Sequence, residues 1–294
     1  MKAITTNVRR AGYWLTGAAL MAATGARAQN LFVSNMSGGA IDKIAPSGVQ
    51  TVFATGLNQP TGLAFDSTGD LFEADGGSGN IYEFINSGGT LSANPVVFAS
   101  GFKDPQGLAF NSAGDLFVSQ LNFNDGIIEM TPGGTQSVFA SNLSPLGLAF
   151  NSSGDLFASN GSGDVVTEIT PGGTQSTFGG LGDNPGGLAF NSAGDLFAST
   201  PAGEVFEFTP AGVRSTFKTG LGTPEGLTFN SSGDLFVSVG KIYEFTPGGA
   251  ETTFASGTPQ ASPGLAFQPV PEPTIWGLLV AGAAALACRR RLQS

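Results

Sequence analysis

A repeated eleven-residue segment constrains the fold of this chain more than any other feature. GLAFNSAGDLF occupies residues 107–117 and returns unchanged at 187–197, and near copies begin at Gly62, Gly147 and Gly226. The copies recur about every forty residues, a period typical of arrays in which each repeat is one small structural unit. The chain therefore consists of equivalent units that pack against one another.

Each unit reads as four short strands. In residues 145–178, apolar runs lie at 147–150, 155–159, 165–169 and 175–178, and Gly, Asn and Pro turns separate them. Short apolar runs between such turns predict an antiparallel meander. A four-stranded unit that recurs about every forty residues is typical of a β-propeller blade.

The number of blades follows from counting first and fourth strands separately. First strands begin at six glycines, and fourth strands carry six phenylalanines: Gly62, Gly107, Gly147, Gly187, Gly226 and Gly264; Phe53, Phe98, Phe139, Phe178, Phe217 and Phe254. One copy is split, since GLAF at 264–267 lacks the GDLF part and NLFVSN at 30–35 lacks the GLAF part. An open ring would expose unpaired strand edges. We therefore predict an all-β, six-bladed β-propeller over residues 29–269, closed by one blade built from both chain ends.

Composition limits the chemistry that this propeller can perform. The sequence holds 24 Phe, no His and one Cys, which is Cys288. Disulfides, Cys/His zinc sites and histidine-dependent catalysis are thereby excluded. Leu156 and Phe157 are neighbours on a strand and must point to opposite faces, so both faces of a blade need burial. We expect the phenylalanines to form the core between blades.

The N-terminal residues 1–28 have the pattern of a secretory signal peptide. Basic residues precede an apolar run from 11 to 23, and the small-residue site Ala26-Arg27-Ala28 follows. Basic, apolar and A-x-A segments in this order indicate export, with cleavage after Ala28.

The C-terminal residues 270–294 contain Pro271-Glu272-Pro273, an apolar run from 274 to 288, and Arg289, Arg290 and Arg291. This arrangement resembles the PEP-CTERM sorting signal of Gram-negative bacteria. The resemblance implies transient membrane anchoring by a transmembrane helix, recognition by an exosortase-type sorting enzyme, and a final location in the cell envelope, at the outer surface or in the extracellular matrix. The arginines would stay on the cytoplasmic side of the membrane.

The repeat itself resembles the NHL repeat, most clearly in PTGLAFDSTGDLFEADGGSGNIYEFINSGG at 60–89. A Pro-x-Gly strand, a Gly-Asp turn and an LFVAD-like strand follow one another as in that family, although the usual Arg before the third strand is missing. At the level of the fold, the likeness extends to six-bladed lactonases of the SMP-30 and gluconolactonase type and to streptogramin-inactivating lyases. Fold alone does not determine function.

Variation among the repeats separates the two faces of the ring. Turns such as NSAGD and TPGG barely change, whereas the loops between strands two and three and between blades differ freely. The loop 66–70 has the look of a calcium loop, but an Asx turn explains it without metal. The face with varied loops is where recognition is expected.

Two positions per blade are predicted to point toward the tunnel on the varied face. One lies between Pro and Gly before strand one, and the other closes strand two. We take the following residues at these positions as the candidate ligand-binding set: Asn35, Asp75, Gln106, Gln120, Asn160 and Glu225.

Two functions are consistent with this pattern. The first, which we favour from the sequence, is a non-catalytic binding or scaffold module for a protein or polysaccharide partner. The alternative is a metal-dependent lactonase or hydrolase that uses Asp75 and Glu225 with Asn35 or Asn160. The resemblance to SMP-30-type enzymes implies a divalent metal at such positions, yet with two carboxylates the metal site is incomplete. We therefore expect no cofactor, with Ca²⁺ or another divalent metal as the alternative.

The charge of the chain bears on its partners. Residues 29–273 keep all 22 acidic residues and only five basic ones, namely Lys43, Lys103, Arg214, Lys218 and Lys241. Such a body repels phosphate backbones, so nucleic acid is not an expected partner. We expect a monomer.

Overall fold

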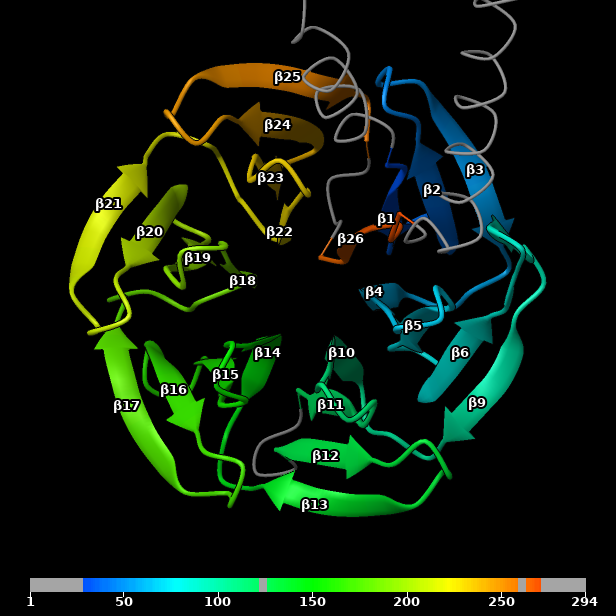
Figure 1. The fold of residues 1–294 in the computed structure, drawn as a ribbon, viewed down its shortest axis with the longest axis horizontal. Helices are drawn as coiled ribbons and strands as arrows, with labels where there is room; N and C mark the ends of the chain where they lie inside the picture. The colour runs from blue at the N-terminus through cyan, green and yellow to red at the C-terminus, as the bar shows by residue number, and fades with distance from the viewer. Residues whose placement is uncertain (1–28, 122–125, 259–262, 271–294) are drawn as a thin grey trace, which may run out of the picture.

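The computed structural model describes residues 29–121, 126–258 and 263–270, and these form an all-β ring. Six four-stranded antiparallel sheets stand around a central axis like the blades of a propeller (Figure 1). In each sheet the first strand lies next to the axis and the fourth at the rim. The six-bladed β-propeller predicted from the repeat is confirmed.

The strands of the first three blades have the following bounds. Blade 1 contains β26 (Leu265–Phe267), β1 (Leu31–Asn35), β2 (Ala40–Ile44) and β3 (Gln50–Thr55); blade 2 contains β4 (Pro60–Phe65), β5 (Leu71–Asp75), β6 (Asn80–Phe84) and β9 (Val96–Ser100); blade 3 contains β10 (Pro105–Phe110), β11 (Leu116–Gln120), β12 (Ile127–Met130) and β13 (Gln136–Ala140). Blade 2 also carries a small hairpin of β7 (Asn86–Ser87) and β8 (Thr90–Leu91), which accounts for its longer repeat.

The remaining blades repeat the plan without insertion. Blade 4 contains β14 (Pro145–Phe150), β15 (Leu156–Asn160), β16 (Val165–Ile169) and β17 (Gln175–Gly180); blade 5 contains β18 (Leu188–Phe190), β19 (Leu196–Thr200), β20 (Glu204–Phe208) and β21 (Arg214–Lys218); blade 6 contains β22 (Leu227–Phe229), β23 (Leu235–Ser238), β24 (Lys241–Phe245) and β25 (Glu251–Ser256).

Blade 1 joins the two ends of the described chain. β26 pairs antiparallel with β1, with Leu31 opposite Phe267 and Val33 opposite Leu265. The Ser34 amide continues the pairing by donating a 3.0 Å hydrogen bond to the Gly264 carbonyl. The split copy of the repeat is therefore one complete blade, and β26 covers the edge of β1 that would otherwise be unpaired.

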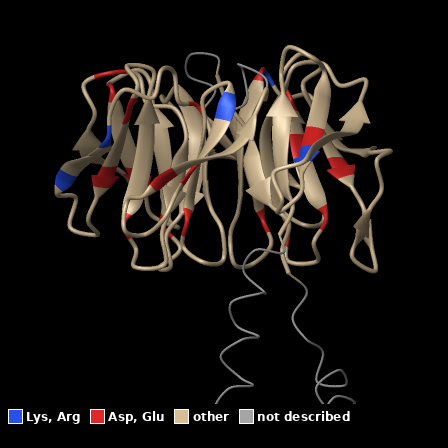
Figure 2. Ribbon diagram, turned by 90° about the horizontal axis from the view of Figure 1, so that it is seen from above, with Lys and Arg blue, Asp and Glu red and all other residues tan. Residues whose placement is uncertain are grey.

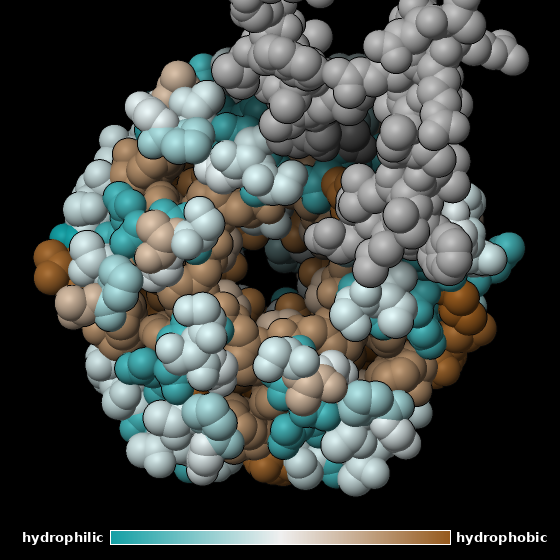
Figure 3. All heavy atoms as spheres, in the orientation of Figure 1, coloured by the Kyte–Doolittle hydropathy of each residue, from teal (hydrophilic) through white to brown (hydrophobic). Residues whose placement is uncertain are grey.

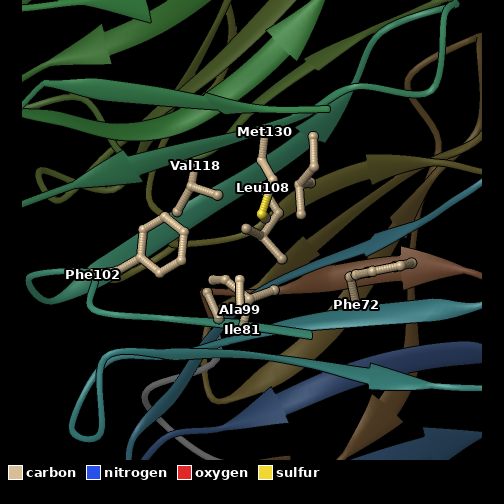
Figure 4. Packing of buried hydrophobic residues seen from close by; sticks show 9 residues of the cluster. Phe72, Ile81, Ala99, Phe102, Leu108, Val118 and Met130 are labelled. Atoms are coloured by element: carbon tan, nitrogen blue, oxygen red, sulfur yellow. The ribbon is translucent and has the colours of Figure 1, made fainter. Parts of the chain in front are cut away.

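Phenylalanines fill the spaces between neighbouring blades. Phe117 of blade 3 meets Phe139 of its own blade and Phe150 of blade 4 edge-on, with ring centroids 4.9 and 5.0 Å apart. Such edge-to-face pairs add about 0.5–1.5 kcal/mol beyond their buried area. Figure 4 shows the corresponding cluster between blades 2 and 3, in which Phe72 and Ile81 pack with Leu108 and Met130. The predicted Phe core is confirmed.

The repeated turns between the first and second strands are closed by their own side chains. In blade 3 the Asn111 side chain accepts hydrogen bonds from the amides of Ala113 and Asp115 and donates to the Asp115 carboxylate. Asp66 accepts in the same way from the amides of Thr68 and Asp70. These Asx turns satisfy their carboxylates without a cation. Acidic residues are scattered over the whole body (Figure 2).

Both ends of the described chain lie on this repeated-turn face. The Gln29 side chain accepts a hydrogen bond from the Ser231 amide, and Gln268 donates to the carbonyl of Gly89 in the β7–β8 turn. The predicted signal peptide, with Ala26 and Ala28, lies outside the described residues. So do Pro271, Glu272, Pro273 and the arginines at 289–291. Within the described part of the chain, no helix has the length and apolar character needed to span a membrane. Export, sorting and membrane anchoring stay predictions.

Candidate functional site

A cavity of about 310 Å³ opens on the varied face at the mouth of the central tunnel. Four Pro-x-Gly turns contribute to its wall, through Gln106, Leu146, Gly186 and Glu225. Loop residues complete it, among them Met36, Asn184, Pro201 and Thr223. A further axial cavity of about 320 Å³, lined by the innermost strands, shares Gly62, Gly107, Gly147, Gly187 and Pro263 with it. In the space-filling view the ring is open at its centre (Figure 3).

The backbone holds Glu225 firmly at this mouth. Its amide donates a 3.1 Å hydrogen bond to the Ser238 carbonyl within blade 6. Its carbonyl accepts from the Gly187 amide at 2.8 Å and from the Ser199 hydroxyl at 3.0 Å, both on blade 5. A Cβ atom on Gly187 would collide with this carbonyl, so the close approach of the two blades requires glycine there. Glu225 is thus positioned by two blades at once.

Gln106 occupies the equivalent turn of blade 3. Its side-chain Nε2 donates a 2.7 Å hydrogen bond to Oδ1 of Asp104. Asp104 adopts a positive φ of 47°, which a short polar side chain tolerates better than most residues. The same Nε2 atom also donates a 3.5 Å hydrogen bond to the Asp104 carbonyl, so Asp104 holds the Gln106 amide in place. Gln106 and Glu225 both line the tunnel-mouth cavity.

The residues that close the second strands serve a different purpose. Asp75 accepts backbone hydrogen bonds at both carboxylate oxygens, from Asn58 at 2.7 Å and from Ser78 at 2.9 Å. Gln120 accepts from the Lys103 amide at 2.8 Å, and Asn160 accepts from Ser144 at 3.1 Å. Each side chain therefore caps the loop that enters its blade, and neither Asp75 nor Gln120 nor Asn160 lines the tunnel-mouth cavity.

Asn35 in blade 1 caps the turn between β1 and β2. Its Oδ1 accepts a 2.8 Å hydrogen bond from the Gly38 amide, and its side chain also bonds to buried Asp42. Burial raises the pKa of Asp42, and the hydrogen bonds from Gln50 and Asn35 partly oppose that rise. Of the six candidate residues, Gln106 and Glu225 line the same cavity from opposite blades, and the other four cap loops or turns.

The predicted metal ligands do not assemble. Among the residues that the structure describes, no group of three or more His, Cys, Asp or Glu side chains could hold a metal ion. Glu225 is the only carboxylate among the described residues of the cavity wall, and Asp75 uses both oxygens for the backbone. Ca²⁺ sites need six to eight oxygen ligands with several carboxylates among them. This donor set therefore does not fit a divalent metal.

A ring of buried serines supports the tunnel wall, and the sequence analysis missed it. The Ser119 hydroxyl accepts from the Gly107 amide and donates to the Leu146 carbonyl of the next blade, both at 2.7 Å. Equivalent serines occur at 34, 159, 199 and 238. Blade 2 has Ala74 at this position, and there the Thr61 hydroxyl lies 2.8 Å from the carbonyls of Ala74 and Pro105. The sequence does contain a signal for this ring, because five repeats have Ser at the fourth position of the LFxS strand.

Glu73 is a second feature that the pattern did not reveal. Its side chain is completely buried on β5, and neither carboxylate oxygen has a hydrogen-bond partner. Burial, with a smaller contribution from nearby Asp75, holds the pKa of Glu73 well above its usual range. The equivalent residues in blades 3 and 6 are Val118 and Val237, both fully buried. Glu73 is therefore a buried carboxyl group at a position where blades 3 and 6 have valine.

Comparison with known proteins identifies the fold but no family. No family model and no curated protein sequence matches the chain. Among solved structures, a nidogen/laminin complex is similar with a TM-score of 0.72 and 18% identity, covering 82% of this chain and 98% of that one. A gluconolactonase from Xanthomonas campestris is similar with a TM-score of 0.62 and 20% identity, covering 71% and 78%. A streptogramin B lyase has a TM-score of 0.62 and 17% identity, covering 81% and 86%.

These likenesses correct one expectation from the sequence. At such identities they establish the shared propeller fold. The non-catalytic binding or scaffold interpretation, which the sequence analysis favoured, is nevertheless contradicted, because the similar structures include gluconolactonases and streptogramin lyases. The physical reason for the error lies in Asp75, Asn35 and Asn160, which were taken for a surface that binds a partner and instead cap loops.

Proposed function

We propose that this protein is an enzyme that hydrolyses a small cyclic ester, with the Glu225 carboxylate acting as general base at the tunnel mouth. The observation that carries this proposal is the position of Glu225, the single carboxylate among the described residues that line the cavity. Hydrogen bonds from two blades fix its backbone. A lone carboxylate in a largely apolar concavity is a typical arrangement for acid–base chemistry.

The chemistry needs only groups present at this mouth. Glu225 takes a proton from a water molecule as the water oxygen attacks the ester carbonyl carbon. The ring C–O bond then breaks, and the protonated Glu225 returns its proton to the departing alkoxide oxygen. The sum is one water added to one lactone to give one hydroxy acid. The side-chain amide of Asn184, which also lines the cavity, can donate a hydrogen bond to the carbonyl oxygen as negative charge develops there.

A hydrolase fits the residue inventory better than a lyase of the streptogramin type. One of the similar structures is a virginiamycin B lyase in which replacement of a histidine by alanine is described as leaving it catalytically inactive. The present sequence contains no histidine. Ester hydrolysis by general-base catalysis needs no histidine, because a carboxylate can take the proton.

The proposal is tested on the purified full chain with a panel of lactones, including γ-butyrolactone and glucono-δ-lactone, by following acid release in weakly buffered solution. We expect turnover of at least one lactone, and we expect it to survive dialysis against EDTA, because the cavity lacks the ligands of a metal. Absence of turnover across the panel would overturn the proposed activity. Turnover that disappears on chelation and returns with Ca²⁺ would overturn the metal-independent mechanism.

A further inference from the structure

A second cavity of about 200 Å³ lies beside the tunnel mouth on the varied face. Its wall is formed by Leu121, Ser144, Leu146, Gly161, Ser162 and Asn184. Leu146 and Asn184 also line the tunnel-mouth cavity. The two cavities are therefore adjacent and share a wall between blades 3, 4 and 5. We call the second one the side cavity.

The chemistry of the side cavity differs from that of the tunnel mouth. None of its described lining residues is charged, whereas the mouth contains Glu225. Leu121 lines this cavity with 39% of its surface exposed to solvent. An exposed leucine at the edge of an uncharged cavity favours an apolar occupant. Hydroxyls of Ser144 and Ser162 add no charge.

Direct packing between blades 4 and 5 fixes the wall that the two cavities share. Asn184 lies in the loop that enters blade 5, and its side chain packs on the backbone of Gly161 in blade 4. A Cβ atom at Gly161 would lie 2.5 Å from Asn184 Oδ1, so the glycine leaves the space that the amide occupies. The Gly161 amide is fixed by a 3.1 Å hydrogen bond to the Ser144 carbonyl. Asn184 is thereby held where it contacts both cavities.

We propose that the tunnel mouth and the side cavity form one bipartite site, in which the ester group lies beside Glu225 and Asn184 while an uncharged apolar arm of the substrate fills the side cavity. This inference rests on the proposed function and narrows its substrate to lactones that carry an alkyl arm. Anionic lactones lack a matching surface in the side cavity, because its described wall offers no cation.

The test uses γ-lactones with linear arms, from γ-valerolactone to γ-nonalactone, and the purified full chain. Burying one methylene is equivalent to about fourfold in an equilibrium or rate ratio, so kcat/KM should rise about fourfold per carbon until the side cavity is full. Leu121→Asp should reduce the preference for the nonalactone over the valerolactone by about tenfold or more, since it places a charge beside the arm. Leu121→Met should keep the preference.

A binding measurement separates this inference from the proposed activity. The probes are 2-alkylcyclopentanones with the same arms, which have no ester to hydrolyse, titrated by calorimetry. Affinity that rises with arm length in wild type and falls in Leu121→Asp supports the bipartite site even if no lactone is turned over. Lactone turnover with kcat/KM and affinity both independent of arm length would overturn it. An unchanged arm preference in Leu121→Asp would also contradict it.

Discussion

The backbone amide of Gly187 donates a 2.8 Å hydrogen bond to the carbonyl oxygen of Glu225 on the next blade. Gly187 belongs to the GLAF segment that recurs along the chain, whereas Glu225 occupies a position at which the repeats have different residues. The contact shows how a repetitive scaffold supports a site, since the repeated glycine lets two inner strands approach until their backbones bond directly. The residue that precedes the first-strand glycine of the next blade, here Glu225 before Gly226, can then differ from blade to blade.

Gly187→Ala should damage stability and the site together. The added methyl group would push against the Glu225 carbonyl, and such overpacking costs about 1–3 kcal/mol of unfolding free energy. Denaturant titration and lactone turnover would both report the change. Gly180→Ala is the matched control, because a Cβ atom there meets nothing within 4 Å. Equal stability of the two variants would show that the blades do not need this close approach.

Ser159→Ala should weaken the serine ring by removing the acceptor for the Gly147 amide, which lies 2.7 Å from the hydroxyl oxygen. A buried donor left without its partner costs about 1–3 kcal/mol. Adding Leu146→Thr should recover part of the loss, since it copies the arrangement of Thr61 and Ala74 in blade 2. Thermal unfolding of the two variants and the wild type is the measurement. A double variant no more stable than Ser159→Ala would refute the equivalence of the two solutions.

Glu73→Val should stabilise the protein at neutral pH. The substitution removes a buried carboxyl without hydrogen-bond partners and introduces the residue found at Val118 and Val237. The gain expected from removing such a group is about 1–3 kcal/mol, measured by urea titration. Glu168→Val, a change at a less buried glutamate on the third strand of blade 4, serves as control. A destabilised Glu73→Val protein would show that the carboxyl has a partner in solution.

Stability should also fall as pH rises, because of Glu73. In the unfolded chain this carboxyl ionises in the ordinary glutamate range, whereas burial keeps the native pKa well above it. Between these two points the unfolded state binds fewer protons, so the free energy of unfolding decreases with pH. The stabilisation is complete below the ordinary range and is lost as pH passes through the raised native value.

The measurement is the difference in unfolding free energy between wild type and Glu73→Gln, from mildly acidic to mildly alkaline pH. The variant cannot ionise at this position, so the difference isolates Glu73. Burial raises the pKa of Asp42 as well, but its contribution is common to both proteins and cancels. A difference that stays constant across the pH range would mean that Glu73 is not held neutral.

The predicted C-terminal signal has a test of its own. Replacing Pro271, Glu272 and Pro273 by alanines in the exported full-length protein should leave the segment 274–294 attached, because the sorting enzyme is expected to recognise this motif. Mass spectrometry of the envelope and medium fractions gives the C-terminal residue. Release at the same residue in wild type and variant would rule out exosortase processing.

The fold was predictable because its determinants are local and repeated. The turn residues around Asn111 and Asp115 and the alternation in the strands occur in nearly every unit, and the split copy at 30–35 and 264–267 fixes the closure. Because every blade has the same pattern of strands and turns, an ambiguous strand assignment in one unit can be settled from the others.

The site was only partly predictable. Gln106 and Glu225 follow from the Pro-x-Gly position, whose direction is set by the inner strand. Asp75 and Asn160 were expected at the tunnel, but their oxygens instead cap backbone amides of the loops that enter their blades. Asn184 lies in a loop that no other repeat shares, and a single sequence contains no pattern from which its place at both cavities could be read.

The central claim is that the Glu225 carboxylate performs acid–base chemistry at the tunnel mouth, and Glu225→Gln tests it most directly. The amide keeps the shape of the side chain and the backbone hydrogen bonds but cannot accept a proton from water. For the best lactone of the panel, kcat should fall by about 10²–10⁴-fold with an unchanged melting temperature, whereas Glu168→Gln should retain wild-type turnover. A Glu225→Gln protein that hydrolyses the lactone at the wild-type rate would contradict the account.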